Sequence, residues 1–181
     1  MINLSQAKNE ILDPFCGKAT ILQEALLMGL NTVGVDKEIQ DAEKNLVWLG
    51  DNYKGKWKLI NGDAAKLSSL VESVEAVATE PYMGPFWKNM PTKEEAMRVA
   101  QKLSELYLEF LKELRKILKG KIAIIMPRFK STSGRVFIDL DGIIKKAGFK
   151  IYQPIKAVPM PIAYYEPHNR LERFIYILEP A

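Results

Sequence analysis

The sequence predicts a single α/β domain over residues 1–181, built around a doubly wound and mostly parallel sheet. Short apolar segments of strand length alternate with helical segments of about 10 to 15 residues, which is typical of β-α-β units. Four successive predicted strands end at or shortly before a carboxylate, namely Asp13, Asp36, Asp63 and Glu80. Because parallel strands present their carboxyl ends at one edge, where such sheets bind ligands, we expect a ligand site there.

The first half of the chain carries four predicted strands, at residues 11–12, 32–35, 58–60 and 74–78. Helices are predicted between them, at residues 19–28, 37–49 and 65–70. Gly29 stops the first helix, and apolar residues on one face make the second helix amphipathic. This alternation favours parallel pairing of the four strands.

The second half begins with the longest predicted helix, which runs from Thr92 to Leu118. Thr92 is a good N-cap, acidic residues occupy the first turn and basic residues the last, and Gly120 stops the helix. The later elements are a strand at residues 121–126, a helix at 136–147, a strand at 149–154, a proline-containing loop at 155–169 and a strand at 173–178. This order fits a sheet with an antiparallel C-terminal strand.

The composition is that of a globular protein, with 48% apolar and 27% charged residues. No apolar run approaches the roughly 20 residues that span a bilayer and no signal-peptide pattern opens the chain, so we expect a cytoplasmic protein without a membrane partner. One cysteine excludes an internal disulfide, and with one histidine it cannot furnish a zinc site, so no metal is expected. The net charge of +4 indicates a polyanionic partner only weakly.

Two common nucleotide-binding motifs fit poorly after the first predicted strand. A nicotinamide or flavin site carries G-x-G-x-x-G there, whereas residues 17–20 (GKAT) contain one glycine. A P-loop requires glycine at position 12 and Ser or Thr after Lys18, but Leu12 and Ala19 stand in those places.

Three segments instead resemble class I S-adenosylmethionine-dependent methyltransferases. They are residues 13–17 (DPFCG), 34–36 (GVD) and 61–64 (NGDA), which follow or end the first three predicted strands. Within this class the sequence is most similar to the tRNA guanine-N2 methyltransferases, and the resemblance covers almost the whole chain. It implies a Rossmann-like methyltransferase fold with S-adenosyl-L-methionine as cofactor. Because that family usually carries an N-terminal THUMP RNA-binding domain, which these residues lack, it also implies a separate RNA-binding domain or chain as partner.

The resemblance implies a cofactor contact for each matching residue. Residues 13–17 would lie under the methionine moiety, Asp36 would bind the ribose hydroxyls, and Asp63 with Ala64 would contact the adenine. The full set of implied cofactor-binding residues is Asp13, Phe15, Cys16, Gly17, Asp36, Lys37, Asp63, Ala64 and Glu80.

Structural roles remain open for three of these residues. Asp36 is also a candidate cap for a helix that begins at Lys37, and Asp63 is a candidate turn or cap residue. Cys16 is better explained as a small packing residue than as a nucleophile, because no base is visible near it in the sequence.

The fourth segment departs from the family pattern, since related enzymes carry Asp or Asn, then two prolines, then Tyr or Phe, whereas residues 80–83 read EPYM. Glu80 is one methylene longer than the usual aspartate, or about 1.5 Å. The carboxylate would accept hydrogen bonds from the amine to be methylated, and Tyr82 or Phe86 would stack on the base. The resemblance thus implies catalytic roles for Glu80, Pro81 and Tyr82 and substrate contacts for Met83, Gly84 and Phe86.

The predicted function is methylation of RNA, at the exocyclic N2 amine of guanosine in tRNA. Methylation of adenine-N6 or cytosine-N4 amines in DNA shares these motifs and is the alternative enzyme activity. A catalytically idle, cofactor-binding RNA-binding subunit is the alternative of a different class. The altered segment at residues 80–83 favours that idle subunit more than the first three motifs do.

Cations and rings near the same sheet edge are candidate RNA contacts. Arg128 and Lys130 follow the predicted strand at 121–126, and residues 131–134 are predicted to form a flexible loop able to close on a substrate. The proline-containing loop adds Tyr164, Tyr165, His168 and Arg170. A solvated loop, and packing of the rings against the sheet, are equally good alternatives.

Overall fold

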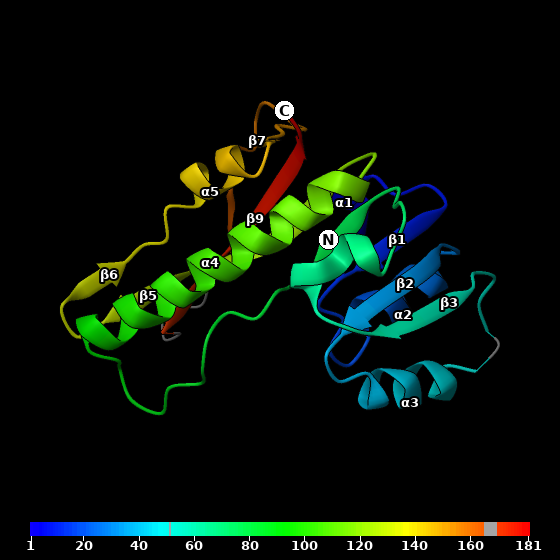
Figure 1. The fold of residues 1–181 in the computed structure, drawn as a ribbon, viewed down its shortest axis with the longest axis horizontal. Coiled ribbons are helices and arrows are strands. Elements are labelled where there is room, and N and C mark those ends of the chain that lie inside the picture. Colours follow the sequence, from blue (N-terminus) through cyan, green and yellow to red (C-terminus); the bar gives the residue numbers. More distant parts are fainter. Residues whose placement is uncertain (51, 165–169) are drawn as a thin grey trace.

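The computed structural model describes residues 1–50, 52–164 and 170–181 and shows a central sheet (Figure 1). Its strands are β1 (Glu10–Asp13), β2 (Asn31–Asp36), β3 (Trp57–Asn61), β4 (Val77–Thr79), β5 (Ile122–Ser131), β6 (Gly134–Val136), β7 (Phe149–Ile151), β8 (Ile162–Tyr164) and β9 (Leu171–Pro180). Within the described residues the order is β3-β2-β1-β4-β5-β9-β7, with β6 paired to β5 and β8 to β9. The neighbouring pairs β3–β2, β2–β1, β1–β4 and β4–β5 are parallel, whereas β9 is antiparallel to β5 and β7. The predicted fold class is confirmed.

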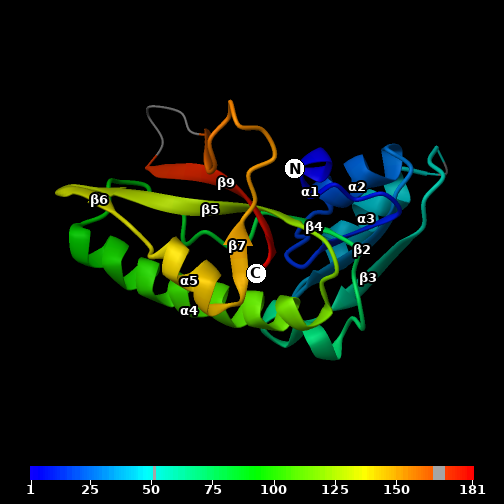
Figure 2. The ribbon, with the colours of Figure 1, turned by 90° about the horizontal axis from the view of Figure 1, so that it is seen from above.

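Helices cover both faces of this sheet (Figure 2). One face carries α1 (Ile2–Ser5), α2 (Thr20–Leu27) and α3 (Gln40–Trp48). The other carries the 3-10 helix η1 (Ala64–Ser69), α4 (Lys93–Ile117) and α5 (Leu140–Lys146). The largest core cluster lies on this second face, where α4 buries Leu103, Tyr107, Phe110, Leu111 and Leu114.

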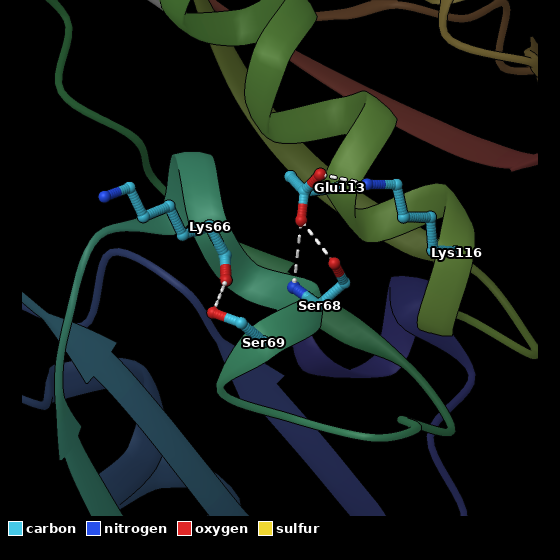
Figure 3. Close-up of polar contacts among 5 residues, drawn as sticks. All are labelled: Lys66, Ser68, Ser69, Glu113 and Lys116. Carbon is cyan, nitrogen blue, oxygen red and sulfur yellow. Dashed lines mark hydrogen bonds and ion pairs between the residues drawn. The ribbon is translucent and has the colours of Figure 1, made fainter.

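Two polar clusters fix α4. At its beginning the Thr92 hydroxyl accepts the Glu95 N–H at 3.2 Å, and the Glu95 carboxylate accepts the Thr92 N–H at 2.8 Å, which is a capping box. Near its end the Glu113 carboxylate pairs with Lys116 and accepts hydrogen bonds from the hydroxyl and the backbone N–H of Ser68 (Figure 3). The Lys116 and Ser68 contacts lower the pKa of Glu113 to about 2. This second cluster ties η1 to α4.

The hairpin of β5 and β6 corrects one prediction. Residues 131–134 form its tight turn and not a flexible loop, because β5 continues to Ser131 and pairs with β6. Gly134 has a φ of +108° in this turn, and the Ser131 hydroxyl donates to the Gly134 carbonyl at 2.7 Å. Since residues 134–136 are used by β6, α5 begins at Leu140 and is shorter than predicted.

Two further elements were not predicted. The short helix α1 precedes β1, and β8 forms inside the predicted loop at 155–169 by pairing with β9. Strand β9 runs from Leu171 to Pro180, longer than expected, because β5, β7 and β8 all pair with it. Two of the candidate RNA contacts, Tyr165 and His168, lie outside the described residues.

Candidate active site

A cavity of about 620 Å³ opens where β1, β2 and β4 end and where β3 leads into η1. The predicted cofactor-binding residues in its lining are Asp13, Phe15, Cys16, Asp36, Lys37, Asp63, Ala64 and Glu80. The predicted residues Pro81, Tyr82 and Met83 line it as well. The structure therefore brings the ends of four strands together around one cavity, at the edge that the sequence indicates.

Asp36 is the last residue of β2, and each of its two carboxylate oxygens accepts a hydrogen bond from a backbone N–H group. Oδ2 accepts the N–H of Gly17 at 2.8 Å, which ties the turn after β1 to the end of β2, and Oδ1 accepts the N–H of Glu38 at 3.2 Å. Helix α3 begins later, with Ile39 at its N-cap position, so Asp36 is not a helix cap. Because a carboxylate oxygen can accept two hydrogen bonds, each oxygen retains one acceptor position for a ligand hydroxyl.

Asp13 is almost completely buried, with 2% of its surface exposed. Its Oδ1 accepts hydrogen bonds from the Thr79 hydroxyl at 2.6 Å and from the Phe15 N–H at 3.1 Å. Burial raises the pKa of Asp13 to about 7, and the negative charges of Asp36 and Glu80 add to the increase. A cationic group bound beside Asp13 would therefore meet a carboxyl group that loses its proton near neutral pH.

Asp63 has the capping role that the sequence left open and also lines the cavity. Its Oδ1 accepts the N–H of Ala65 at 3.0 Å, which caps η1. Its Oδ2 pairs with the Lys37 ammonium at 2.9 Å, and these two contacts lower the pKa of Asp63. The Asn61 side chain donates to the Lys37 carbonyl at 2.7 Å, so the ends of β2 and β3 are joined beside the cavity.

The turn after β1 is compact. The Cys16 N–H donates to the Val35 carbonyl at 3.1 Å, and Ala19 donates to the Cys16 carbonyl at 2.7 Å. Ala19 has a φ of +67°, a conformation that glycine adopts more readily. Burial, together with the charges of Asp13 and Asp36, raises the pKa of the Cys16 thiol to about 12. Cys16 is thus a packed thiol in this structure, as the simpler interpretation of the sequence expects.

Glu80 follows β4 and forms an ion pair that the sequence does not predict. Its Oε1 lies 3.2 Å from Nε of Arg173. Arg173 belongs to β9 and lies opposite Pro127 of β5, so the pair spans the intervening strand β5. The pair is partly exposed, with 44% of the Glu80 side chain and 33% of the Arg173 side chain accessible.

The segment after Glu80 is anchored by the core of α4. The buried Tyr107 hydroxyl donates to the Tyr82 carbonyl at 2.9 Å. Gly84 has a φ of +98°, and a Cβ at this position would lie 2.8 Å from Cγ1 of Val99. Both observations fix the course of the chain at Gly84 and leave the ring of Tyr82 exposed.

A second cavity of about 400 Å³ lies beside the first and shares Met83 with it. Its lining consists of Met83, Gly84, Pro85, Phe86, Trp87, Arg170, Leu171 and Arg173. Phe86 is 88% exposed, whereas Trp87 packs edge-on against Phe129, with ring centroids 5.4 Å apart. Arg170 donates to the Trp87 carbonyl. The second cavity therefore combines aromatic surface with two guanidinium groups.

Arg128 and Lys130 are in the lining of neither of these cavities. Arg128 packs over the rings of Phe137 and Phe174, at 4.8 and 4.2 Å, and its Nη1 lies 3.8 Å from the buried Glu172 carboxylate. Lys130 is paired within the sheet, where its N–H donates to the Arg170 carbonyl. RNA contact by Arg128 or Lys130 stays a prediction, while the structure shows Arg128 held by the protein itself.

The described part of the chain offers neither a metal site nor a membrane-spanning helix. There, no group of three or more His, Cys, Asp or Glu side chains is placed to hold a metal ion. Nor does any helix in the described ranges combine the length and the apolar character needed to cross a membrane.

Comparison with known proteins identifies the family. Residues 1–136 match the RMKL-like methyltransferase domain. The chain belongs to this methyltransferase family. One solved structure with the same fold, the 1,6-didemethyltoxoflavin-N1-methyltransferase of Burkholderia thailandensis, holds S-adenosylhomocysteine; its TM-score is 0.60, with 11% identity over 97% of this chain and 72% of that protein.

Three similar proteins illustrate the relationship. The tRNA (guanine(10)-N2)-dimethyltransferase of Pyrococcus abyssi is 31% identical, over 99% of this chain and 47% of the relative. The protein of the same name from Methanothermobacter thermautotrophicus is 33% identical, over 80% of this chain and 39% of the relative. TrmN from Thermus thermophilus has the same fold, with a TM-score of 0.65 and 18% identity over 99% of this chain and 47% of TrmN. The methyltransferase domain thus spans less than half the length of these proteins.

Proposed function

We propose that this methyltransferase domain transfers a methyl group from S-adenosylmethionine to the exocyclic N2 amine of guanosine in tRNA. The observation that carries the proposal is the position of Glu80, a hydrogen-bond acceptor in the lining of the first cavity whose ion-pair partner Arg173 lines the second. The two relatives named tRNA (guanine(10)-N2)-dimethyltransferase support tRNA and guanine N2 as the acceptor. As the resemblance to the tRNA guanine-N2 methyltransferases implies, we expect a separate RNA-binding domain or chain to assist.

The residues of the first cavity fit S-adenosylmethionine. Asp36 has one acceptor position left on each oxygen, which suits the two ribose hydroxyls. Asp13 offers a buried carboxyl group to the cofactor's ammonium, a charge-assisted contact. Asp63 supplies an acceptor for the adenine amino group, and Ala64 supplies apolar surface for the ring. In this assignment Phe15, Cys16, Gly17 and Lys37 complete the cofactor-binding set.

The acceptor base would enter from the second cavity. Met83, which lines both cavities, and the exposed rings of Tyr82 and Phe86 offer surfaces on which a base can stack. Gly84 keeps the chain clear of the base, and Pro81 fixes the backbone carbonyl next to Glu80. Glu80 then accepts a hydrogen bond from the N2 amine.

This hydrogen bond explains how the domain could activate a weak nucleophile. The lone pair of the N2 amine is delocalised into the guanine ring, which makes the nitrogen a poor nucleophile. A hydrogen-bond acceptor at the N–H group increases the electron density on the nitrogen. S-adenosylmethionine supplies a methyl group on a positively charged sulfur. As the N–C bond forms and the S–C bond breaks, the electron pair of the S–C bond stays on sulfur, giving the neutral thioether of S-adenosylhomocysteine. The methylated nitrogen then loses its extra proton to water, so no general base is required.

The test is transfer of radiolabelled methyl groups to tRNA transcripts, with the modified nucleoside identified by mass spectrometry. We expect N2-methylated guanosine, and a transcript with inosine at the mapped position should accept no methyl group because inosine lacks the N2 amine. Glu80→Ala should abolish transfer while leaving S-adenosylmethionine affinity within a few-fold. Glu72→Ala, which removes an exposed carboxylate elsewhere, is the matched control.

Other outcomes point to the two alternatives. Transfer to adenine-N6 or cytosine-N4 in DNA, without transfer to tRNA, would overturn the choice of acceptor. Normal cofactor binding with no transfer to tRNA or DNA would favour the idle subunit. An unchanged rate in Glu80→Ala would remove Glu80 from the proposed site.

A further inference from the structure

The Glu80–Arg173 ion pair connects the two cavities of the candidate site. Glu80 belongs to the lining of the first cavity and Arg173 to that of the second. Only Oε1 of Glu80 contacts the guanidinium, through Nε at 3.2 Å. Within the described residues Oε2 accepts no hydrogen bond, so it is available to a bound molecule.

Alternation along β9 explains why Arg173 reaches Glu80. Successive residues of a strand point to opposite faces of the sheet. Glu172 turns toward the α4 and α5 face, where it pairs with Arg128 and Arg135. Arg173 therefore turns to the other face and spans β5 to meet the end of β4.

The lengths of the two side chains match the distance they span. Strands β4 and β9 are separated by β5, which places them about 9 to 10 Å apart, or two strand spacings. A glutamate and an arginine together cover this distance along the face of the sheet. An aspartate at position 80 would be about 1.5 Å shorter and would lose the contact.

Stability is a poor explanation for this pair. Both side chains are partly exposed, and ion pairs of this kind contribute little to the free energy of folding. Orientation is a better explanation, because a longer side chain has more rotamers and a misplacement of about 1 Å at a reacting centre can cost 100-fold in rate. One hydrogen bond from Arg173 selects the rotamer of Glu80.

We propose that Arg173 is a positioning residue for methyl transfer: it holds Oε1 of Glu80 so that Oε2 faces the amine of the acceptor base. This inference rests on the proposed function of Glu80. Arg173 acts through Glu80 and does not itself touch the reacting atoms. In this proposal the extra methylene of Glu80 allows its carboxylate to reach Arg173, and Arg173 in turn orients that carboxylate.

A double-mutant cycle tests the role in transfer. We expect Arg173→Gln to lower kcat about 10- to 100-fold, with the KM for tRNA and the affinity for S-adenosylmethionine changed less than threefold. Arg173→Lys should restore part of the loss, because it keeps the charge. In a Glu80→Gln background, Arg173→Gln should have little further effect. Lys150→Gln is the matched control, because it removes an ion pair between Lys150 of β7 and Glu179 at the other end of β9.

Three results of the cycle would overturn the inference. Equal losses in the wild-type and Glu80→Gln backgrounds would show that Arg173 acts independently of Glu80. An effect confined to the KM for tRNA would assign Arg173 to direct substrate binding. A faster Arg173→Gln variant would show that the pair restrains Glu80 instead of preparing it.

A second measurement does not depend on activity. In a ¹⁵N–¹H spectrum of the whole chain, the Arg173 Nε–H signal should be protected from exchange in the wild type and lose this protection in Glu80→Asp and Glu80→Gln. An unprotected signal in the wild type would overturn the inference by itself. Failure of the wild type to methylate any tRNA, with the Arg173 signal protected, would instead overturn the proposed function and leave the ion pair established.

Discussion

The proposed site has a cofactor side (Asp13, Asp36 and Asp63) and an acceptor side (Glu80), and the two sides hold their carboxylates in different ways. On the cofactor side Asp13, Asp36 and Asp63 each accept the backbone N–H of the residue two positions later. On the acceptor side Glu80 is held by a side chain 93 positions later. Each cofactor-side carboxylate therefore keeps one contact that is local to its own turn, whereas the contact of Glu80 with Arg173 exists only when β4, β5 and β9 are assembled.

This difference in how the carboxylates are held leads us to expect that cofactor binding and methyl transfer depend on different contacts. Each cofactor-side carboxylate accepts at least one backbone N–H, in addition to the Thr79 hydroxyl on Asp13 and the Lys37 ammonium on Asp63. Glu80 depends on the side chain of Arg173, so substitution of Arg173 changes the orientation of Glu80 while the backbone contacts of the cofactor-side carboxylates stay in place. Cofactor affinity and transfer rate should therefore respond most strongly to different residues.

The largest expected effect on cofactor binding comes from Asp36→Ala. Loss of both ribose acceptors should weaken S-adenosylmethionine binding by about 1 to 3 kcal/mol, which is roughly 5- to 150-fold. Calorimetric titration measures this change. Asp41→Ala, which removes an exposed carboxylate from the first turn of α3, should leave the affinity unchanged. Normal affinity in Asp36→Ala would refute the ribose assignment.

A pH dependence of binding is the next expected effect, and it comes from Asp13. Because its pKa is about 7, the carboxyl group is mostly protonated at pH 6 and mostly ionised at pH 8. If the ionised form binds the cofactor's ammonium, affinity should rise about fivefold from pH 6 to pH 7, a range in which an α-ammonium group stays mostly charged. Asp13→Asn, which retains an acceptor for the Thr79 hydroxyl, should bind more weakly and without this rise. A flat profile in the wild type would contradict the ammonium contact.

The same raised pKa has the opposite consequence for folding. A carboxyl group that is harder to ionise in the folded state contributes stability below its unfolded pKa of 3.8 and loses it as the pH rises through about 7. Stability and cofactor affinity should thus change in opposite directions across this range. Thermal unfolding with and without S-adenosylmethionine would separate the two.

That Asp13, Asp36, Asp63 and Glu80 line one cavity was predictable from the sequence, whereas the contacts that hold Glu80 and the segment after it were not. Asp36 ends β2 and Asp63 lies two residues after β3, and each has one contact with a residue two positions later in the chain. Arg173 resembles any other residue at the start of a strand, and Tyr107 resembles the other core residues of α4. The turn at 131–134 was mispredicted for the same reason, because pairing between β5 and β6 decides its conformation.

The smallest expected effect concerns Tyr107, whose hydroxyl anchors the segment after Glu80 through the Tyr82 carbonyl. Tyr107→Phe keeps the ring in the core and removes one hydrogen bond, so it should lower the free energy of unfolding by about 0.5 to 1.5 kcal/mol. Because the released carbonyl belongs to the acceptor side, kcat should fall modestly while S-adenosylmethionine affinity stays the same. Denaturant unfolding and calorimetry measure the two quantities. A loss of cofactor affinity equal to the loss of kcat would show that the two sides are coupled through α4, against the separation inferred from their hydrogen bonds.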